Sequence, residues 1–229
     1  MKNDTRSSSA VFVAVSLCFF LSGFAALLYQ TAWMRQLSTV FGTSELAVAT
    51  VLAAYMAGLA VGAAIAARVM GRIRRPILVY GVLEGTIAIS AIAVPFLLQL
   101  AGIAYAALFG GQPQPPDASG LGQSTFYLSA TFLVLIVPTA CMGATLPMVT
   151  RYAVHKDEDV GPRVGLLYSI NTSGAIAGTL VAAFLLLPAL GLWGTVLVGA
   201  LVNLGVFGVA ALLAISTTIE STTSSDSKS

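Results

Sequence analysis

Six long apolar runs constrain this chain more than any other feature of its sequence. A helix needs about 20 apolar residues to cross the hydrocarbon core of a bilayer, and each run is about that long or longer. Charged residues make up only 9% of the 229 residues, against roughly a quarter in a soluble domain, so the chain cannot cover a water-facing surface. The predicted spans are residues 10–29, 45–67, 77–101, 124–149, 164–188 and 191–216.

The runs are continuous rather than alternating, which favours spanning helices over the strands of a membrane barrel. The sequence therefore predicts an all-α polytopic membrane protein with one membrane domain, residues 10–216. Residues 1–9 precede this domain, a Gly- and Pro-rich segment at 102–123 forms its only long loop, and 217–229 form a disordered tail. The apolar run at 11–28 is too long for a signal peptide, so we expect it to stay as the first helix.

The basic residues predict the orientation of the chain. With six spans, ten of the eleven Lys and Arg residues fall on one side of the membrane and only Arg35 falls on the other. Positive charge concentrates in cytoplasmic loops. Both termini are therefore predicted to be cytoplasmic and the loop at 102–123 extracytoplasmic, in a membrane of the bacterial inner-membrane type.

Small residues recur at four-residue spacing within the spans. Such pairs let helix backbones approach closely in lipid, so they predict tight packing at Gly58/Gly62, Gly81/Gly85 and Gly174/Gly178. Residues 54–67 and 167–183 also resemble each other weakly, each with a tyrosine ahead of a GxxxG pair. With three helices in each half, this echo predicts a 3+3 inverted repeat, the construction of a transporter-like half. The alternative is that any two small-residue helices look alike.

Glu84 lies well inside the third run, with no basic residue close to it in sequence. Ionisable groups at such depth are costly and face the protein interior or a watery cavity. At 100° per residue Glu84 shares a helix face with Gly81 and Gly85, so its carboxyl group is predicted to point toward other helices.

The fifth run carries polar residues that could partner this carboxyl group. Tyr168, Asn171 and Thr172 share one face there by the same arithmetic, and we expect them to contact Glu84. Two interpretations of the contact stay open. In the functional one, Glu84 binds a proton or a cation. In the structural one, its carboxyl group locks helices together by hydrogen bonds.

The segment after the first run contains Tyr29, Trp33 and Arg35. Tyr and Trp near a helix end fit an interfacial aromatic belt, and Arg35 can extend to lipid head groups. Because Arg35 is the only base on its side, a site that accepts an anion, or a pair with Glu45, is the alternative. The candidate substrate-binding residues are therefore Glu84, Tyr168, Asn171, Thr172, Tyr29 and Arg35.

Three separated blocks of the sequence resemble one protein family. They are LSGFAALLYQTAWMRQLSTVFGTSELAVATVLAAYMAGLAVGAAIAAR, PTACMGATLPMVTR and LYSINTSGAIAGTLVAAFLLLPALGL. The chain resembles the membrane domain of spermidine-synthase-like integral membrane proteins, which are bacterial proteins often described as fusions of a transporter-like domain with a spermidine synthase. The likeness extends from about residue 16 to residue 213. The glycine-rich nucleotide pocket of the family's soluble domain has no counterpart here, so no aminopropyl transfer is expected.

Two functions from different classes follow from these observations. The first is a transporter-like protein that binds a small cation, such as a polyamine, at Glu84 and is completed by a homodimer or another chain. The second is a non-transporting membrane subunit that anchors or assembles a partner enzyme or electron-carrier complex. An enzyme is not predicted, since the spans hold no paired carboxylates and no histidine. Cys18, Cys141 and His155 lack metal-ligand spacing, no cofactor site is expected, and a net charge of +2 argues against nucleic-acid binding.

Overall fold

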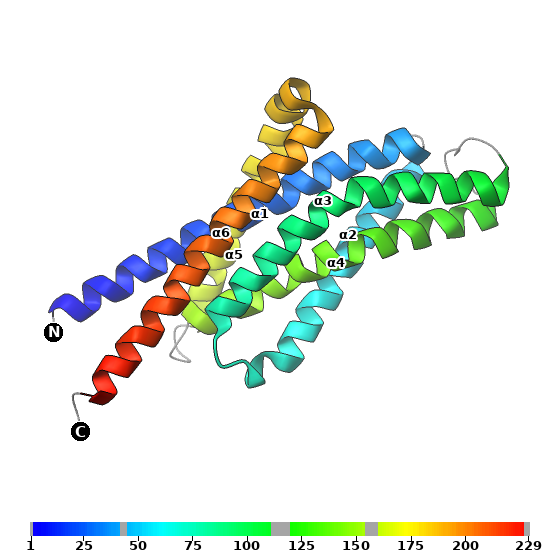
Figure 1. Ribbon diagram of the computed structural model, residues 1–229. Helices are drawn as coiled ribbons and strands as arrows, with labels where there is room; N and C mark the ends of the chain where they lie inside the picture. The colour runs from blue at the N-terminus through cyan, green and yellow to red at the C-terminus, as the bar shows by residue number, and fades with distance from the viewer. Residues whose placement is uncertain (1, 42–44, 111–119, 154–159, 227–229) are drawn as a thin grey trace.

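The computed structural model describes residues 2–41, 45–110, 120–153 and 160–226, and every element in these ranges is a helix (Figure 1). The elements are α1 (Lys2–Phe41), α2 (Glu45–Val69), the 3-10 turn η1 (Met70–Arg72), α3 (Pro76–Phe109), α4 (Leu121–Ala153), α5 (Val160–Val181), the π-helix η3 (Ala182–Leu186) and α6 (Leu187–Asp226). The predicted all-α fold class is confirmed over these ranges. His155 and the centre of the predicted loop lie outside them.

Five segments of the described chain are long and apolar enough to cross a membrane. They are Val11–Thr39, Val48–Arg72, Pro76–Phe109, Gly122–Ala153 and Gly161–Ser216. The chain therefore has the length and composition of a multi-pass membrane protein, as predicted. The last segment is 56 residues long and contains α5, η3 and α6, which the sequence predicts as two spans.

The helix direction reverses inside this last segment, where α5 meets α6 (Figure 1). The π-helix η3 follows α5, and Gly191 then takes φ 68° and ψ −170°. This backbone conformation is essentially restricted to glycine, since any Cβ would clash with the neighbouring peptide groups. Gly191 therefore breaks the helix and lets the chain turn back.

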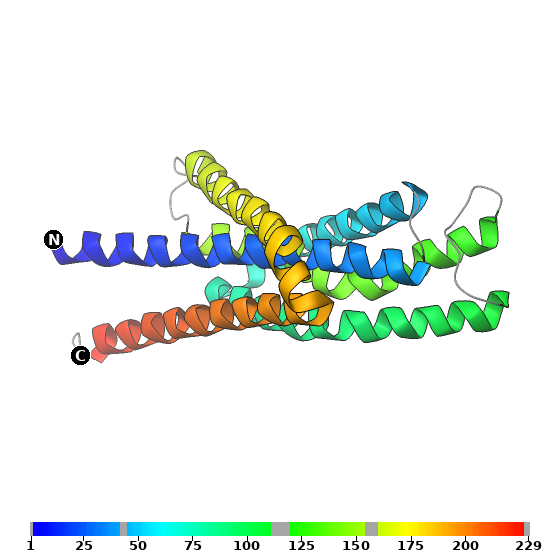
Figure 2. The same cartoon turned by 90° about the horizontal axis from the view of Figure 1, so that it is seen from above.

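The helices pack in the lateral order α2, α4, α3, α6, α1, α5. Along this series α2 packs on α4, α4 on α3, α3 on α6, α6 on α1, and α1 on α5. Both termini lie at the same end of the bundle, as two perpendicular views agree (Figures 1 and 2). The helices α3 and α6 thus form the centre of the bundle, and α2 and α5 form its edges.

Glycines set the closest helix contacts at these edges. A Cβ added at Gly62 of α2 would lie 1.8 Å from the carbonyl oxygen of Ala140 in α4. A Cβ added at Gly178 of α5 would lie 2.0 Å from the carbonyl oxygen of Phe24 in α1. Because the atom met is backbone in both cases, only glycine permits these approaches.

The other glycines of the predicted pairs take two kinds of position. Gly58 and Gly174 belong to the same close contacts as Gly62 and Gly178, facing Thr139 and the Phe20 carbonyl. Gly81 and Gly85 of α3 lie instead against α6. A Cβ added at Gly81 would lie 3.1 Å from the Ala210 Cβ, a tight contact, and one added at Gly85 would meet the Phe207 ring at an ordinary 3.7 Å. All three pairs therefore face neighbouring helices.

Several helices are longer than the predicted spans. α1 continues from residue 29 to Phe41, α3 continues from residue 101 to Phe109, and the α6 backbone is helical through Asp226, within the tail predicted to be disordered. Each added residue extends a helix by one hydrogen bond, so the helix continues beyond its apolar run until a breaker stops it. Gly110, with φ 69°, caps α3 in this way.

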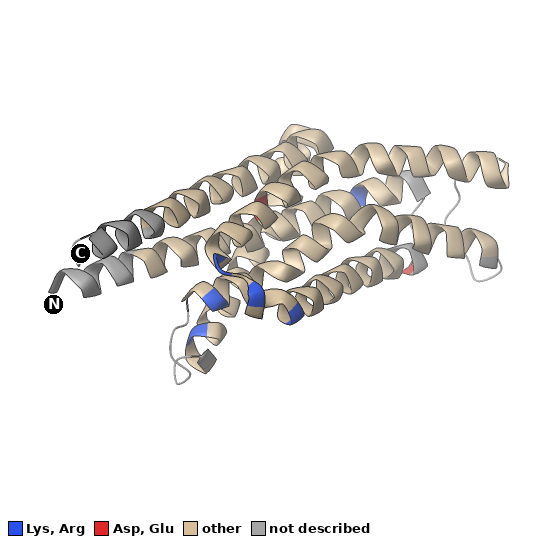
Figure 3. Cartoon of the chain, turned by 60° about the horizontal axis from the view of Figure 1, so that its bottom comes forward, with Lys and Arg blue, Asp and Glu red and all other residues tan. Residues whose placement is uncertain are grey.

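The basic residues are unevenly distributed along the long axis of the bundle (Figure 3). Most of the described basic residues gather at the end where α2, α4 and the start of α5 meet: Arg68, Arg72, Arg74, Arg75, Arg151 and Arg163. Arg35, near the C-terminal end of α1, lies apart from them. This distribution is the one that the positive-inside rule describes for loops on the two sides of a membrane.

Candidate functional site

Glu84 lies at the centre of the bundle, on the face that α3 turns toward α1 and α6. The side chain is fully buried, with 0% of its surface exposed. Tyr80, Gly81, Ile87, Ala88 and Ala91 of the same helix are buried with it. The inward orientation that the sequence predicts for this carboxyl group is therefore present in the structure.

Both carboxyl oxygens of Glu84 accept a hydrogen bond from another helix. The Ser22 hydroxyl of α1 donates to Oε1 at 2.5 Å, and the Asn203 amide of α6 donates to Oε2. The Tyr29 hydroxyl of α1 in turn donates to the Asn203 side-chain oxygen at 2.9 Å. We call these four residues, Ser22, Tyr29, Glu84 and Asn203, the central polar cluster. It ties α1, α3 and α6 together, and all four of its residues are buried.

Aromatic side chains pack around the central polar cluster. Tyr80 is fully buried, places its hydroxyl beside the Glu84 carboxyl group, and packs edge-on against Phe19 with ring centroids 6.5 Å apart. Tyr29 stacks on Trp33 with centroids 5.2 Å apart and planes 9° from parallel. In the described part of the chain no Lys or Arg pairs with Glu84, so hydrogen bonds rather than an ion pair satisfy the carboxyl group.

The polar stripe of α5 does not contact Glu84, and that prediction is wrong. Tyr168 is 62% exposed and Thr172 is exposed as well, on the outer surface of the bundle. Asn171 donates to the carbonyl oxygen of Phe19 in α1 at 2.9 Å. The packing explains this difference. α5 packs on α1 through Gly174 and Gly178, so α1 lies between α5 and α6 in the lateral order of the helices.

The hydroxyl groups on this outer face bond back to their own helix. Ser169 donates to the Gly165 carbonyl oxygen at 2.9 Å, Thr172 to that of Tyr168 at 2.8 Å, and Ser173 to that of Ser169 at 2.8 Å. A hydroxyl bonded in this way is satisfied without water or a partner. The stripe can therefore face lipid or another helix at low cost.

Tyr29 and Trp33 are not part of an interfacial belt. Both are fully buried, and Tyr29 belongs to the central polar cluster. The sequence places a turn here, whereas α1 continues for twelve residues beyond Tyr29 to Phe41. No Gly or Pro lies between Gly23 and Gly42, so nothing in the chain ends the helix earlier.

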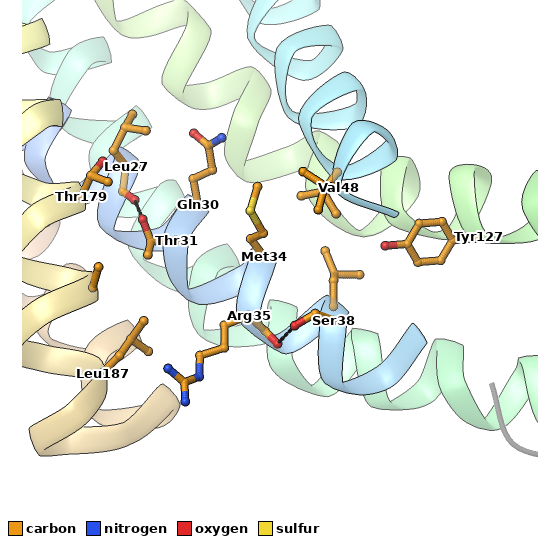
Figure 4. A pocket seen from close by; sticks show the side chains of 13 residues that line it. Leu27, Gln30, Thr31, Met34, Arg35, Ser38, Val48, Tyr127, Thr179 and Leu187 are labelled. Carbon is orange, nitrogen blue, oxygen red and sulfur yellow. Dashed lines mark hydrogen bonds between the residues drawn. The ribbon is translucent and has the colours of Figure 1, made fainter. Parts of the chain in front are cut away.

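Arg35 is exposed and makes no ion pair with any described residue, so the alternative pairing with Glu45 is not formed. It lines a cavity of about 580 Å³ that α1 shares with α2, α4, α5, η3 and α6 (Figure 4). Glu84 is not among the residues that line this cavity. The six candidate site residues therefore lie in four places. Glu84 and Tyr29 belong to the central polar cluster, Asn171 lies at the α1–α5 contact, Tyr168 and Thr172 lie on the outer face of α5, and Arg35 lines the cavity.

Sequence reasoning missed Ser22 and Asn203, which are the two direct partners of Glu84. A signal for Asn203 was present, because it is one of only two asparagines within the apolar runs. The asparagine chosen, Asn171, lies beside hydroxyl groups and glycines, whereas Asn203 stands alone among apolar residues. Isolation in an apolar run is the better indicator of a buried partner, since a lone amide has no local group to satisfy it.

The described residues contain no group of three His, Cys, Asp or Glu side chains that could hold a metal ion. Cys18 is buried and Cys141 is partly buried, and both are free thiols. Comparisons with protein-family models, with curated proteins and with solved structures find no match to this chain. The resemblance to spermidine-synthase-like membrane domains therefore stays a prediction.

Proposed function

We propose that this chain is a membrane subunit that holds a partner chain, rather than a transporter that works through Glu84. The observation that carries the proposal is an uncovered small-residue stripe on α5. Gly161, Gly165, Ser169 and Ser173 follow one another at four-residue spacing and are all exposed, and no atom of the described residues lies within 4 Å of a Cβ added at either glycine. In lipid, stripes of this kind are the surfaces on which helices associate.

The closed state of the central polar cluster supports the same proposal. Transport of a cation through Glu84 needs a path from water to the carboxyl group, whereas its oxygens are occupied by Ser22 and Asn203 and its surface is fully buried. A carboxyl group bonded to two other helices stabilises their arrangement. Glu84 is thus explained as a structural residue of the subunit.

We place the chain in a bacterial-type inner membrane, crossing it six times with both termini cytoplasmic. The fifth apolar segment would extend about 84 Å as one straight helix, nearly three times the ~30 Å of hydrocarbon that one crossing needs. The reversal at Gly191 divides it into two crossings of opposite direction. Arg35 then lies on the extracytoplasmic side and the cluster of basic residues on the cytoplasmic side.

An inverted repeat of α1–α3 and α4–α6 is also part of the proposal. Exchanging α1 with α4, α2 with α5 and α3 with α6 turns the α2–α4 contact into the α5–α1 contact, and the α3–α4 contact into the α6–α1 contact. Both edge contacts use a GxxxG pair, and in each pair at least one glycine lies against a backbone carbonyl of the neighbouring helix. The α3–α6 seam, which holds Glu84 and Asn203, then lies on the repeat axis.

This symmetry favours one second candidate, a transporter-like protein for a proton or small cation, including a polyamine. Transporters built from inverted repeats place their binding site at the repeat interface near the middle of the membrane, and in the proposed repeat Glu84 and Asn203 meet at that interface. The structure would then correspond to an occluded state. Uptake measurements that compare wild type with Glu84→Gln separate the two candidates.

The test of the proposed subunit function is photo-crosslinking in native membranes. A photoreactive amino acid at Ser169 or Ser173 is expected to form a protein adduct, because these positions lie in the uncovered stripe. The matched control positions are Ile89 and Leu212, which are 71% and 69% exposed on apolar faces and are expected to react with lipid only. An adduct of about twice 23.5 kDa identifies a second copy, and another mass identifies a different chain. Lipid adducts alone at Ser169 and Ser173 would refute the proposal.

A further inference from the structure

A groove follows α1 on its way to the C-terminal end of the helix. Its floor is α1 itself, and its walls are the start of α2 on one side and the end of α5 with η3 on the other (Figure 4). The groove exists because α2 packs mainly on α4 and leaves this face of α1 uncovered. Its volume of about 580 Å³ lies within the ~300–1,000 Å³ range of sites that hold small molecules.

The inner part of the groove is lined by apolar side chains. Val51, Leu37 and Leu187 are buried residues of its lining, and Leu27 and Met34 complete the surface that α1 contributes. An acyl chain fits such a surface because both are apolar and neither requires hydrogen bonds. The π-helical residue Ala183 lies in the wall, and π-helical turns occur frequently at functional sites.

Two polar side chains of the groove lack partners within the described protein. The Gln30 side chain is only 9% exposed, and its amide makes no hydrogen bond to any described residue. The Gln30 side chain lines the cavity, where a group of a bound ligand can reach the amide and form a hydrogen bond with it. The Arg35 guanidinium, which forms no ion pair, lies at the mouth of the groove.

The order of these groups along α1 matches the order of groups in a phospholipid. Arg35 lies closest to the end of the apolar segment, Gln30 lies five residues deeper, about 7.5 Å along the helix, and Leu27 lies deeper still. A phosphate at Arg35 places an ester carbonyl near Gln30 and the chain on the apolar floor. Among the described residues that line the groove, none is acidic, so these residues offer no partner to the ammonium group of a zwitterionic head group.

We propose that this groove binds an anionic phospholipid, with its phosphate on Arg35, an ester carbonyl on Gln30 and an acyl chain against α1. A guanidinium group pairs with phosphate through two parallel hydrogen bonds, and among the described residues Arg35 is the base that lines the groove. The site is separate from both Glu84 and the α5 stripe. It therefore does not depend on whether the chain holds a partner or transports a cation.

The test is native mass spectrometry of the protein after reconstitution in bilayers of equal phosphatidylglycerol and phosphatidylcholine. Wild type is expected to retain phosphatidylglycerol in clear preference to phosphatidylcholine. Arg35→Gln is expected to lower the retained phosphatidylglycerol about tenfold, the size of one charge-assisted contact. Gln30→Leu is expected to lower it by a smaller factor, because a neutral hydrogen bond is lost.

The matched control is Arg68→Gln, which removes an exposed arginine at the other end of the bundle and is expected to leave retention unchanged. If Arg35→Gln does not purify in a folded form, Thr31→Leu fills the groove without a change of charge and is expected to reduce retention of both lipids. Equal retention of the two lipids by wild type, or equal losses in Arg35→Gln and Arg68→Gln, would overturn the proposal. Retention of a fatty acid in place of phospholipid would overturn it as well.

Discussion

Replacing Gly62 with leucine is expected to lower the free energy of unfolding by about 1–3 kcal/mol or to prevent folding, which is the range for overpacked sites. A Cβ at this position would lie 1.8 Å from the Ala140 carbonyl oxygen, and the backbone of α4 cannot move without losing its other contacts with α2. In a bilayer the close approach of backbones is itself a main source of helix association. The loss is measured by thermal or denaturant unfolding in a fixed detergent.

The matched control is Gly205→Leu in α6. Nothing lies within 4 Å of a Cβ added there, and glycine is exposed at this position, so leucine is expected to be neutral or to stabilise the helix by up to about 1 kcal/mol. Gly178→Leu is expected to behave like Gly62→Leu, because a Cβ added at Gly178 would also lie against a backbone oxygen, 2.0 Å from that of Phe24. Equal stability of Gly62→Leu and Gly205→Leu would show that α2 and α4 do not pack through this face.

The second large effect is expected for Asn203→Leu, with a loss of about 1–3 kcal/mol in the free energy of unfolding. The substitution removes the donor to Glu84 Oε2 and the acceptor of the Tyr29 hydroxyl, and leaves both groups buried without a partner. Glu84→Gln keeps the size of the side chain and an acceptor oxygen, so a much smaller loss is expected. Unfolding in detergent measures both variants.

A double variant makes this prediction specific. When Glu84→Leu and Asn203→Leu are combined, both partners of the hydrogen bond become apolar, and the loss is expected to be smaller than the sum of the two single losses. Additive losses would mean that the two side chains do not interact in the folded protein. Ile89→Leu, on an exposed face of α3, is the control that changes neither the cluster nor the core.

Much of the fold follows from the sequence because the relevant signals are local. Apolar run length predicts which segments have the character of spans, and GxxxG spacing predicts which faces permit close packing. The depth of Glu84 and its shared face with Gly81 predict that the carboxyl group points inward, as it does. Each of these inferences depends on one helix only.

Local signals do not show which polar residue meets Glu84, because that depends on how separate helices are arranged; the isolation of Asn203 in an apolar run marks it only as a candidate. α5 carries two small-residue stripes, one with Gly161 and Gly165 and one with Gly174 and Gly178, and either could have docked on α1. The structure uses the second stripe, which turns Tyr168 and Thr172 outward. The sequence alone does not distinguish the stripes, because both satisfy the same packing rule.

The predicted end of the first helix is wrong for a different reason. The first span is predicted to end at residue 29, at the end of the apolar run, but the end of an apolar run does not end a helix that has no Gly or Pro there. The extension brings Tyr29 and Trp33 inside the bundle and leaves Gln30 and Arg35 on the groove. Because the predicted first span is too short, it misses both the role of Tyr29 in the central polar cluster and the groove beside Gln30 and Arg35.

The claim that Glu84 is a closed structural residue is tested most directly by uptake into proteoliposomes. Wild type and Glu84→Gln are reconstituted in parallel, and the uptake of labelled spermidine and of protons is followed under an imposed gradient. We predict that both proteins match protein-free vesicles, because the carboxyl group is fully buried and bonded to Ser22 and Asn203. Uptake by wild type that Glu84→Gln abolishes would contradict the account and establish Glu84 as a transport site.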